Sequence, residues 1–307
     1  MPFGIRPSNV RVCHSTTRAR ERLKRAEFAA EFAAWQVGFG LTPALAPNRN
    51  QSSMSMTMNK SESDWIKIDL HIHTLDDPKD VIDYSAHQLL ERAKQLGFGV
   101  LAITLHDAVF DRAEVFADAA TMGILLIPAA EVRLEDADII LLNVTAEEVA
   151  TLKSFDDVRK LRAHRGLSIF TFAPHPFFVL GGSIGERLLE EIDCFDAIEQ
   201  CHFHKGLFDL NRRAVKVAAQ FAKPLIATSD CHQLHAFGRH YTSIQRPREL
   251  TIENVFAALR SGPHQVVSPS ASIVDLASAI YFFFVTHPVR IRRHRSRVSA
   301  LESESQT

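Results

Sequence analysis

From about residue 65 to residue 268, short apolar runs alternate with longer segments in which apolar residues recur every three or four positions. The short runs predict strands over 66–70, 100–104, 124–127, 138–144, 167–172, 196–199 and 225–228, with Pro128 ending the third of them. The longer segments predict helices over 84–96, 112–122, 146–165, 186–192, 207–222 and 252–260. Strands that are apolar on both faces and alternate with helices indicate an α/β protein. Its parallel sheet would be covered on both faces or closed into a barrel.

The two ends of the chain do not follow this alternation. Residues 1–60 are predicted to be an extension outside the fold, because a short amphipathic stretch is followed there by a run rich in Pro, Asn, Ser and Met. Three interpretations of this extension are open: a disordered segment, a translation start assigned too far upstream when the real one lies near Met54, or an organelle transit peptide. One domain is therefore expected over residues 61–268, followed over 269–307 by a last helix and a basic tail.

The net charge of −1, from 35 Lys+Arg and 36 Asp+Glu residues, is unevenly distributed. Residues 1–60 carry a net +6 and residues 288–307 a net +3, so that residues 61–287 carry a net −10. An acidic body argues against a long nucleic-acid duplex as the main partner and favours a site that holds cations.

Cysteine usage and hydropathy bear on the compartment. The four cysteines form no Cys-x-x-Cys pair and are too unevenly spread for a disulfide framework, so reduced thiols in a cytoplasmic protein are expected. The longest late apolar run, residues 280–285, is far shorter than the ~20 residues that a membrane span needs, and no span is predicted.

Metal-binding residue types follow six of the predicted strands. In chain order they are His71 and His73, His106 and Asp107, Glu131, His175, His202 and His204, and Asp230 and His232. In a βα barrel the C-terminal ends of the strands converge on one face, where the active site is built. Any one of these motifs is weak evidence in a chain with 15 histidines, but their order and their common position predict a joint site.

The residue types indicate the chemistry. Two histidines at positions i and i+2 of an extended segment, such as His71 and His73, point to the same side and can hold one cation. A carboxylate such as Glu131 can bridge two cations. Imidazole and carboxylate ligands suit Zn, Mn or Fe better than Mg or Ca. Two or three such ions lower the pKa of a shared water and neutralise a phosphate, so hydrolysis of a phosphoester is expected.

These motifs resemble those of the PHP family, named for its polymerase and histidinol phosphatase members. The resemblance spans residues 66–245 and rests on five motifs in the family's order: Asp69 to Thr74, Thr104 to Asp107, Glu131, the Pro-His-Pro of residues 174–176, and Ser229 to His232. It implies a distorted (β/α)7 TIM-like barrel with a trinuclear metal centre at the C-terminal ends of the strands.

The resemblance also implies a ligand set. One metal would be held by His71, His73, Glu131 and Asp230, which would also activate the catalytic water. Glu131 would bridge to a second metal held by His175 and His202, and a third would be held by His106 and His232. The third site needs an acid from the loop after His73, for which Asp77 is preferred over Asp80. Leu105 departs from the family, since many members have an aspartate there, and its presence puts the third site in doubt.

The expected function is that of a metal-dependent phosphoesterase acting on a small phosphorylated metabolite or a nucleotide, with two or three ions of Mn, Zn or Fe. Four side chains near metal positions are candidates for holding the substrate phosphate: Arg133, Lys205, Arg239 and His240. The alternative is a binding or regulatory module that keeps metal for stability and recognises a phosphorylated ligand without cleaving it. The Arg-rich ends offer a weaker hypothesis, contact with RNA or an anionic membrane.

Overall fold

The computed structural model describes residues 64–178, 182–202, 204–205, 208–209, 211–272 and 281. The predicted extension, 1–60, lies outside the described residues, as does most of the predicted segment 269–307. The domain boundaries therefore stay a prediction.

A nine-stranded sheet forms the centre of the fold, in the order β11-β10-β1-β2-β3-β4-β5-β6-β9. Its strands are β1 (Trp65–Ile72), β2 (Phe98–His106), β3 (Leu125–Leu134), β4 (Ala137–Leu142), β5 (Phe170–Ala173), β6 (Ala197–Gln200), β9 (Leu225–Ala227), β10 (Tyr241–Gln245) and β11 (His264–Val267). Strands β1 to β3 are parallel, as are β5, β6 and β9, whereas β4, β10 and β11 pair antiparallel with their neighbours.

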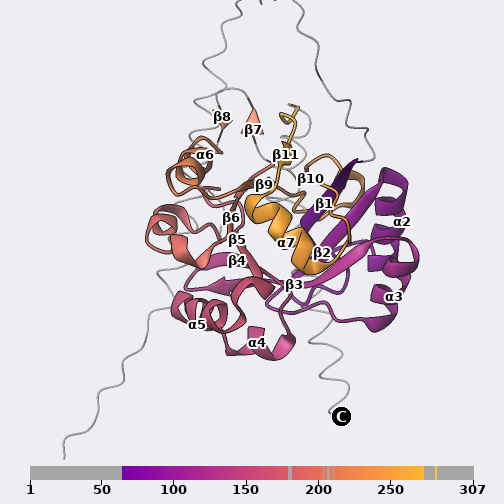
Figure 1. Cartoon of the computed structure of the whole chain (residues 1–307), viewed down its shortest axis with the longest axis horizontal. Coiled ribbons are helices and arrows are strands. Elements are labelled where there is room, and N and C mark those ends of the chain that lie inside the picture. The colour runs from indigo at the N-terminus through magenta and orange to yellow at the C-terminus, as the bar shows by residue number, and fades with distance from the viewer. Residues whose placement is uncertain are drawn as a thin grey trace, which may run out of the picture. The chain divides into compact units, whose positions relative to one another are not determined.

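The sheet curls until its two edges meet (Figure 1). Thr242 of β10 bonds the backbone of Ala227 in β9 twice through its hydroxyl, as donor and as acceptor, at 2.9 Å each. His264 Nε2 of β11 lies 3.1 Å from the carbonyl oxygen of Leu225. These contacts nearly close the sheet, so the expected α/β barrel is confirmed.

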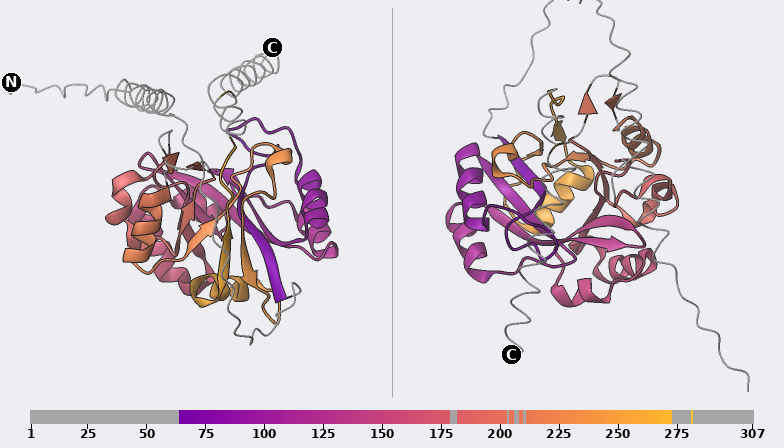
Figure 2. Two further views of the ribbon diagram at one scale, coloured as in Figure 1. Left: turned by 90° about the horizontal axis from the view of Figure 1, so that it is seen from above. Right: turned by 180° about the vertical axis from the view of Figure 1, so that it is seen from behind.

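Most of the helices lie outside the barrel (Figures 1 and 2): α2 (Ala86–Leu96), α3 (Ala113–Thr121), α4 (Ala146–Thr151), α5 (Phe155–Arg165) and α6 (Asn211–Gln220). Local sequence fixes their ends. Helix α2 begins at a capping box between Ser85 and Gln88 and ends at Gly97, whose φ of 75° is the left-handed conformation that favours glycine.

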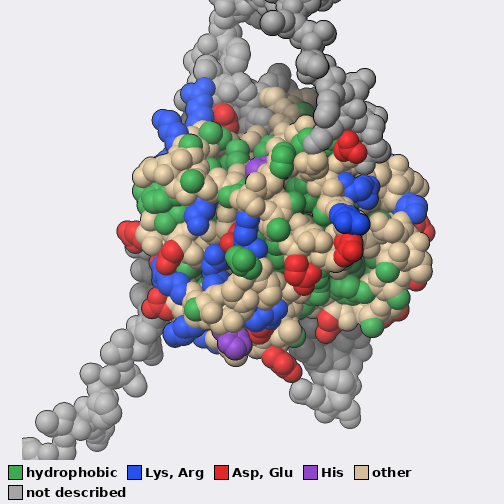
Figure 3. Space-filling model, viewed as in Figure 1, with side chains coloured by type: hydrophobic (Ala, Val, Ile, Leu, Met, Phe, Trp, Pro, Cys, Tyr) green, Lys and Arg blue, Asp and Glu red, His purple; other side chains and the backbone are tan. Residues whose placement is uncertain are grey.

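The barrel interior is apolar and is closed at one end by α7 (Ile252–Ser261). Phe256 of α7 packs against Phe170 at the start of β5, with ring centroids 5.4 Å apart. Helix α7 thus covers the end where the parallel strands begin, and acidic and basic side chains are interspersed over that face (Figure 3). Two further apolar clusters fill the space between the sheet and the outer helices, one beside α2 and α3 and one beside α4 to α6. The C-terminal ends of the strands are left for a site.

The structure corrects several sequence-based expectations near β3 and β4. Strand β3 does not end at Pro128 but continues to Leu134, and the Pro128 carbonyl accepts a 2.6 Å bond from the backbone of Asn143. Glu135 and Asp136, with φ of 49° and 68°, then form a two-residue turn into β4. The sheet is therefore mixed rather than fully parallel.

The helices also differ from expectation in places. The predicted helix 146–165 is two helices, because Ser154 starts α5 as an N-cap after an extended Leu152. The predicted helix 207–222 begins only at Asn211, and the two short strands β7 (His204–Lys205) and β8 (Phe208–Asp209) precede it. Strands β10 and β11 were not predicted. Residues 166–168, 185–189, 192–194 and 234–236 form single 3₁₀ turns.

Within the described residues, no helix is both long enough and apolar enough to cross a membrane.

Candidate metal centre

Histidines from separate strands meet at the C-terminal end of the barrel. The His73 ring lies 5.3 Å from that of His71 and 4.5 Å from those of His106 and His232, measured between centroids, and the His71 ring lies 5.8 Å from that of His175. His71 and His106 belong to β1 and β2, whereas His175 and His232 follow β5 and β9. The fold thus gathers residues that are far apart in the sequence.

The backbone turns sharply where some of these strands end. Asp107, His175 and Asp230 have positive φ, at 53°, 30° and 44°. Such conformations are strained for residues other than glycine, and they persist where the surrounding structure enforces them, often at functional sites. Here they occur directly after β2, β5 and β9.

Four donor atoms form a compact group: Nε2 of His71, Nε2 of His73, Oε2 of Glu131 and Oδ1 of Asp230. The two histidine nitrogens lie 3.3 Å apart. Each of them lies 3.4 Å from Glu131 Oε2 and 3.4 Å from Asp230 Oδ1. His71, His73 and Glu131 therefore form a nearly equilateral triangle of donor atoms, and Asp230 forms a second one with the same two histidines.

These edge lengths test whether a metal ion fits. An equilateral triangle with sides of this size has its centre about 2.0 Å from each corner, so an ion fits at the bond length of about 2.0 to 2.2 Å that Zn²⁺ prefers with nitrogen and oxygen ligands. The two nitrogens and two carboxylate oxygens also match the ligand preference of Zn, Mn and Fe. The donor atoms of His71, His73 and Glu131 therefore fit one divalent ion.

Glu131 is central to the whole cluster. Its Oε2 lies 3.3 Å from His106 Nε2, in addition to the contacts with His71 and His73, and its Oε1 lies 3.5 Å from His175 Nε2. The two oxygens of one buried carboxylate thus face different histidines. This is the arrangement that a carboxylate bridging two ions requires.

Both acids considered in the loop after His73 reach the cluster. Asp77 Oδ2 lies 3.1 Å from His73 Nδ1 and 2.8 Å from His106 Nδ1. Asp80 Oδ2 lies 3.1 Å from His232 Nε2. Asp77 thus faces His73 and His106, whereas Asp80 faces His232, so the two acids take different places in the cluster.

His202 lies in the same region. Burial lowers its pKa to about 4, against the opposing influence of the Asp230 and Glu199 carboxylates. Its ring packs 5.6 Å from that of His240. A buried, neutral imidazole is the form that binds a metal.

Histidines and carboxylates shift each other's pKa values strongly here. Burial lowers the pKa of His175 and of His232, but the surrounding carboxylates outweigh it, Glu131 and Asp230 for the first and Asp230 and Asp80 for the second, and raise each pKa to about 9. Burial alone would raise the pKa of Glu131 and of Asp230, yet His71 and its neighbours hold both far below the usual range. Without an ion, His175 and His232 are therefore imidazolium groups paired with carboxylates, whereas His202 stays neutral.

Two buried acids were missed in the sequence. Glu199 of β6 contacts His71 Nδ1 at 3.2 Å through Oε1, and its Oε2 accepts a hydrogen bond from the backbone of His175. Asp69 accepts bonds from the backbones of His71 and Ser229 at 3.4 and 3.1 Å, and burial raises its pKa to about 7. Glu199 ends the predicted strand 196–199 and Asp69 lies inside the predicted strand 66–70, and the available signal was a carboxylate within a largely apolar run.

The four candidates for phosphate binding are placed differently. Among the candidates whose side chains the structure describes, Arg133 alone lines the mouth of the centre, a cavity of about 310 Å³ bordered by Lys79, Asp80, His106, Asp107, Glu131, Arg133 and Asp138. Arg133 forms a two-bond ion pair with Asp138, at 2.6 and 2.7 Å. His240 is buried, with Nδ1 2.9 Å from the Ser268 hydroxyl; Arg239 is exposed; and the Lys205 side chain is outside the described part of the structure.

Leu105 packs away from this polar network. It is 4% exposed and belongs to the apolar cluster beside α2 and α3. The carboxylate next to His106 comes instead from Asp77.

Comparison with known proteins gives one family match and several structural relatives. Residues 209–263 match the PHP-associated family. An uncharacterized protein of Methanocaldococcus jannaschii is 27% identical over 146 residues, which are 43% of this chain and 82% of that protein.

Among solved structures, a two-domain protein of Bacteroides vulgatus containing a predicted PHP-like metal-dependent phosphoesterase has a TM-score of 0.51 at 19% identity, over 72% of this chain and 69% of that one. PsfC of Pseudomonas syringae has a TM-score of 0.52 at 18% identity, over 71% of this chain and 98% of that one. At these identities the likeness concerns the fold. The match of residues 209–263 to the PHP-associated family, and the fold shared with a PHP-like protein, support the resemblance of this chain to the PHP family.

Proposed function

We propose that this protein is a metal-dependent phosphoesterase that hydrolyses a small phosphorylated metabolite or a nucleotide. The observation that carries the proposal is that the Nε2 atoms of His71 and His73 lie 3.3 Å apart and each lies 3.4 Å from a carboxylate oxygen of both Glu131 and Asp230. The Bacteroides vulgatus protein, described as containing a predicted PHP-like metal-dependent phosphoesterase, shares the fold and supports the same reaction class.

The remaining side chains suit two further ions. Glu131 Oε1, His175 and His202 are assigned to a second ion, and His106 and His232, with Asp77 and Asp80 beside them, to a third. The ions are assigned as Mn, Zn or Fe on ligand type. When bound, they would supply an acidified water and neutralise charge on the phosphate.

The chain's own residues position these groups. Glu199 holds Nδ1 of His71, so that Nε2 faces Glu131 and Asp230. Arg133 and Lys79 bring positive charge to the mouth of the centre, where Asp138 and Asp107 hold them. A phosphate entering this mouth would meet the Arg133 guanidinium, which pairs with Asp138 through Nε and Nη2 and has further N–H groups to donate.

Elemental analysis of the purified protein, paired with phosphatase assays on the same batch, tests the proposal. Two to three equivalents of Mn, Fe or Zn are expected, with turnover of phosphomonoesters that a chelator abolishes. Metal without turnover of phosphomonoesters, phosphodiesters or nucleotides would favour the non-cleaving binding module. Failure to bind metal after reconstitution would contradict both functions.

Arg133→Lys is expected to raise KM for a phosphomonoester about tenfold and to change kcat much less, because the guanidinium N–H groups that Asp138 does not occupy are lost while a cation remains beside Asp138. Steady-state kinetics of the metal-loaded protein measures this. Arg248→Lys, an exposed arginine before α7, is the matched control and should leave both constants unchanged. An unchanged KM in Arg133→Lys would remove Arg133 from the phosphate site.

A further inference from the structure

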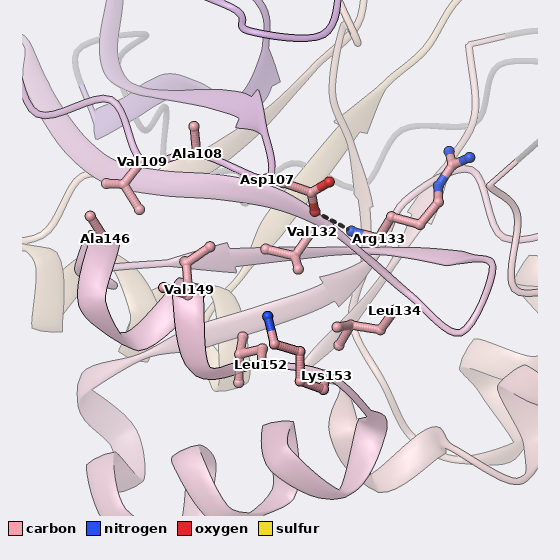
Figure 4. Close-up of a pocket in the computed structure, with 11 residues that line it drawn as sticks. Asp107, Ala108, Val109, Val132, Arg133, Leu134, Ala146, Val149, Leu152 and Lys153 are labelled. Carbon is pink, nitrogen blue, oxygen red and sulfur yellow. Dashed lines mark hydrogen bonds between the residues drawn. The ribbon is translucent and has the colours of Figure 1, made fainter.

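A second and larger cavity adjoins the mouth of the metal centre. It has a volume of about 550 Å³, within the range of small-molecule sites. Asp107 and Arg133 border both cavities. Figure 4 shows it between the end of β3, the loop after β2 and helix α4.

The alternation of side chains along β3 separates the two cavities. Glu131 and Arg133 border the mouth, whereas Val132 and Leu134 belong to the apolar cluster beside α4. Asp107 stands at the boundary, where its backbone N–H donates to the Glu131 carbonyl at 2.7 Å and its carboxylate accepts from the Arg133 backbone at 2.8 Å. A ligand whose phosphate lies in the mouth can therefore extend over this rim into the larger cavity.

The lining of the larger cavity is mainly apolar. Val132 and Leu134 of β3, with Val149 and Leu152 at α4, are all at most 6% exposed and form its floor. Ala146 and Ala150, one turn apart on α4, also line it, and their small side chains leave space. Burying an apolar group about the size of an aromatic ring against this surface is favourable, because it removes apolar area from water.

Lys153 adds one positive charge to this apolar lining. Figure 4 shows its amine directed back across the cavity toward Val132. Among the described residues the ammonium has no ion-pair or hydrogen-bond partner. A cation at the edge of an apolar cavity suits an anionic group at the end of an apolar ligand.

We infer that this cavity, lined by Val132, Val149, Ala150 and Lys153, binds the leaving group of the phosphoester. It selects an alcohol with an apolar, ring-sized body that ends in an anionic group. The inference rests on the proposed phosphoesterase function and adds a substrate class to it. The substrate would be a phosphomonoester whose leaving group ends in an anionic group of its own.

The inference is tested with three substrates: methyl phosphate, phenyl phosphate and 4-carboxyphenyl phosphate. Each is assayed with the metal-loaded wild type and with three metal-loaded variants, Ala150→Trp, Glu147→Trp and Lys153→Met. Each substrate is compared only between variants, so its intrinsic reactivity cancels. Ala150→Trp fills the cavity and should lower kcat/KM for both aryl phosphates roughly 10- to 100-fold while leaving methyl phosphate unchanged. Glu147→Trp, an exposed position on the same helix that does not line the cavity, should leave all three unchanged.

Lys153→Met should lower kcat/KM about three- to fivefold for 4-carboxyphenyl phosphate alone, and added salt should reduce the wild-type preference for this substrate. Equal effects of Ala150→Trp on all three substrates, or no effect on any, would overturn the inference while the phosphoesterase function stands. If Lys153→Met kept the wild-type preference for 4-carboxyphenyl phosphate over phenyl phosphate, the part of the inference that places an anionic group beside Lys153 would be wrong. If the metal-loaded wild type turns over none of the three phosphomonoesters and no nucleotide, the proposed function fails and the inference fails with it.

Discussion

Glu131→Gln is expected to lower turnover of a phosphoester by about a thousandfold or more and to remove most of the bound metal. Glutamine keeps the size of the side chain but loses its charge and replaces one oxygen with an amide nitrogen, which cannot bind a cation. One oxygen of Glu131 lies against His71, His73 and His106 and the other against His175, so an amide nitrogen in either place removes a ligand atom. Elemental analysis and kcat/KM on the same preparation measure both effects together.

The chelated form of this variant supplies a second readout. Without metal, the Glu131 carboxylate offsets the positive charge of the buried histidines, so its loss should lower the free energy of unfolding by about 3 kcal/mol. Glu147→Gln, on the exposed surface of α4, should change neither metal content nor stability. A Glu131→Gln protein that keeps its full metal content would contradict the bridging role of this carboxylate.

The position of the site could be predicted because it depends on sheet geometry rather than on any one side chain. His71, Glu131 and Asp230 are separated by up to 159 positions in the sequence, but each lies at or near the C-terminal end of a β-strand that runs in the same direction. Strands that are apolar on both faces can be recognised without a structure, and so can the polar residues that follow them. Which residues share one ion stays a prediction.

The mixed topology could not be predicted from hydrophobic pattern alone. Strand β4 is fully buried, so its apolar run looks the same whether it pairs parallel or antiparallel with β3. The turn at Glu135 and Asp136 lacks the Asn-Gly or Asp-Gly sequence that normally marks a two-residue hairpin. Strand β10 is only partly apolar, and it is recognised as a strand only through its pairing with β1.

Supporting acids were missed for a different reason. Glu199 was included in a predicted strand, where its neighbours Ala197 and Ile198 are apolar. Its function depends on contacts with His71 and His175, which stand 128 and 24 positions away. A carboxylate inside a buried strand nevertheless needs a partner, since an unpaired buried charge is costly, and this requirement is a usable signal.

Opposite pH trends are expected for the stability of the metal-free and metal-loaded protein. In the metal-free form, the carboxylates raise the pKa of His175 and of His232 to about 9, above the value of 6.5 for an unfolded histidine. Their contribution to stability is therefore complete below about pH 6.5 and is lost as the pH rises through 9. The loss should be on the order of 3 kcal/mol in all, less than for two separate groups, because both histidines interact with Asp230.

Metal binding reverses this trend because it requires neutral imidazoles, and protons compete with the ion wherever the histidines stay charged. An ion present at a thousand times its Kd adds about 4 kcal/mol, and this gain should increase from pH 6.5 toward pH 8.5. Thermal unfolding with Zn²⁺ or with a chelator, at several pH values in this range, measures the difference in Tm. His235→Gln, an exposed histidine outside the cluster, should leave both trends unchanged, whereas His232→Gln should flatten them. A chelated protein that gains stability between pH 6.5 and 8.5 would contradict the charge network on which the proposed centre rests.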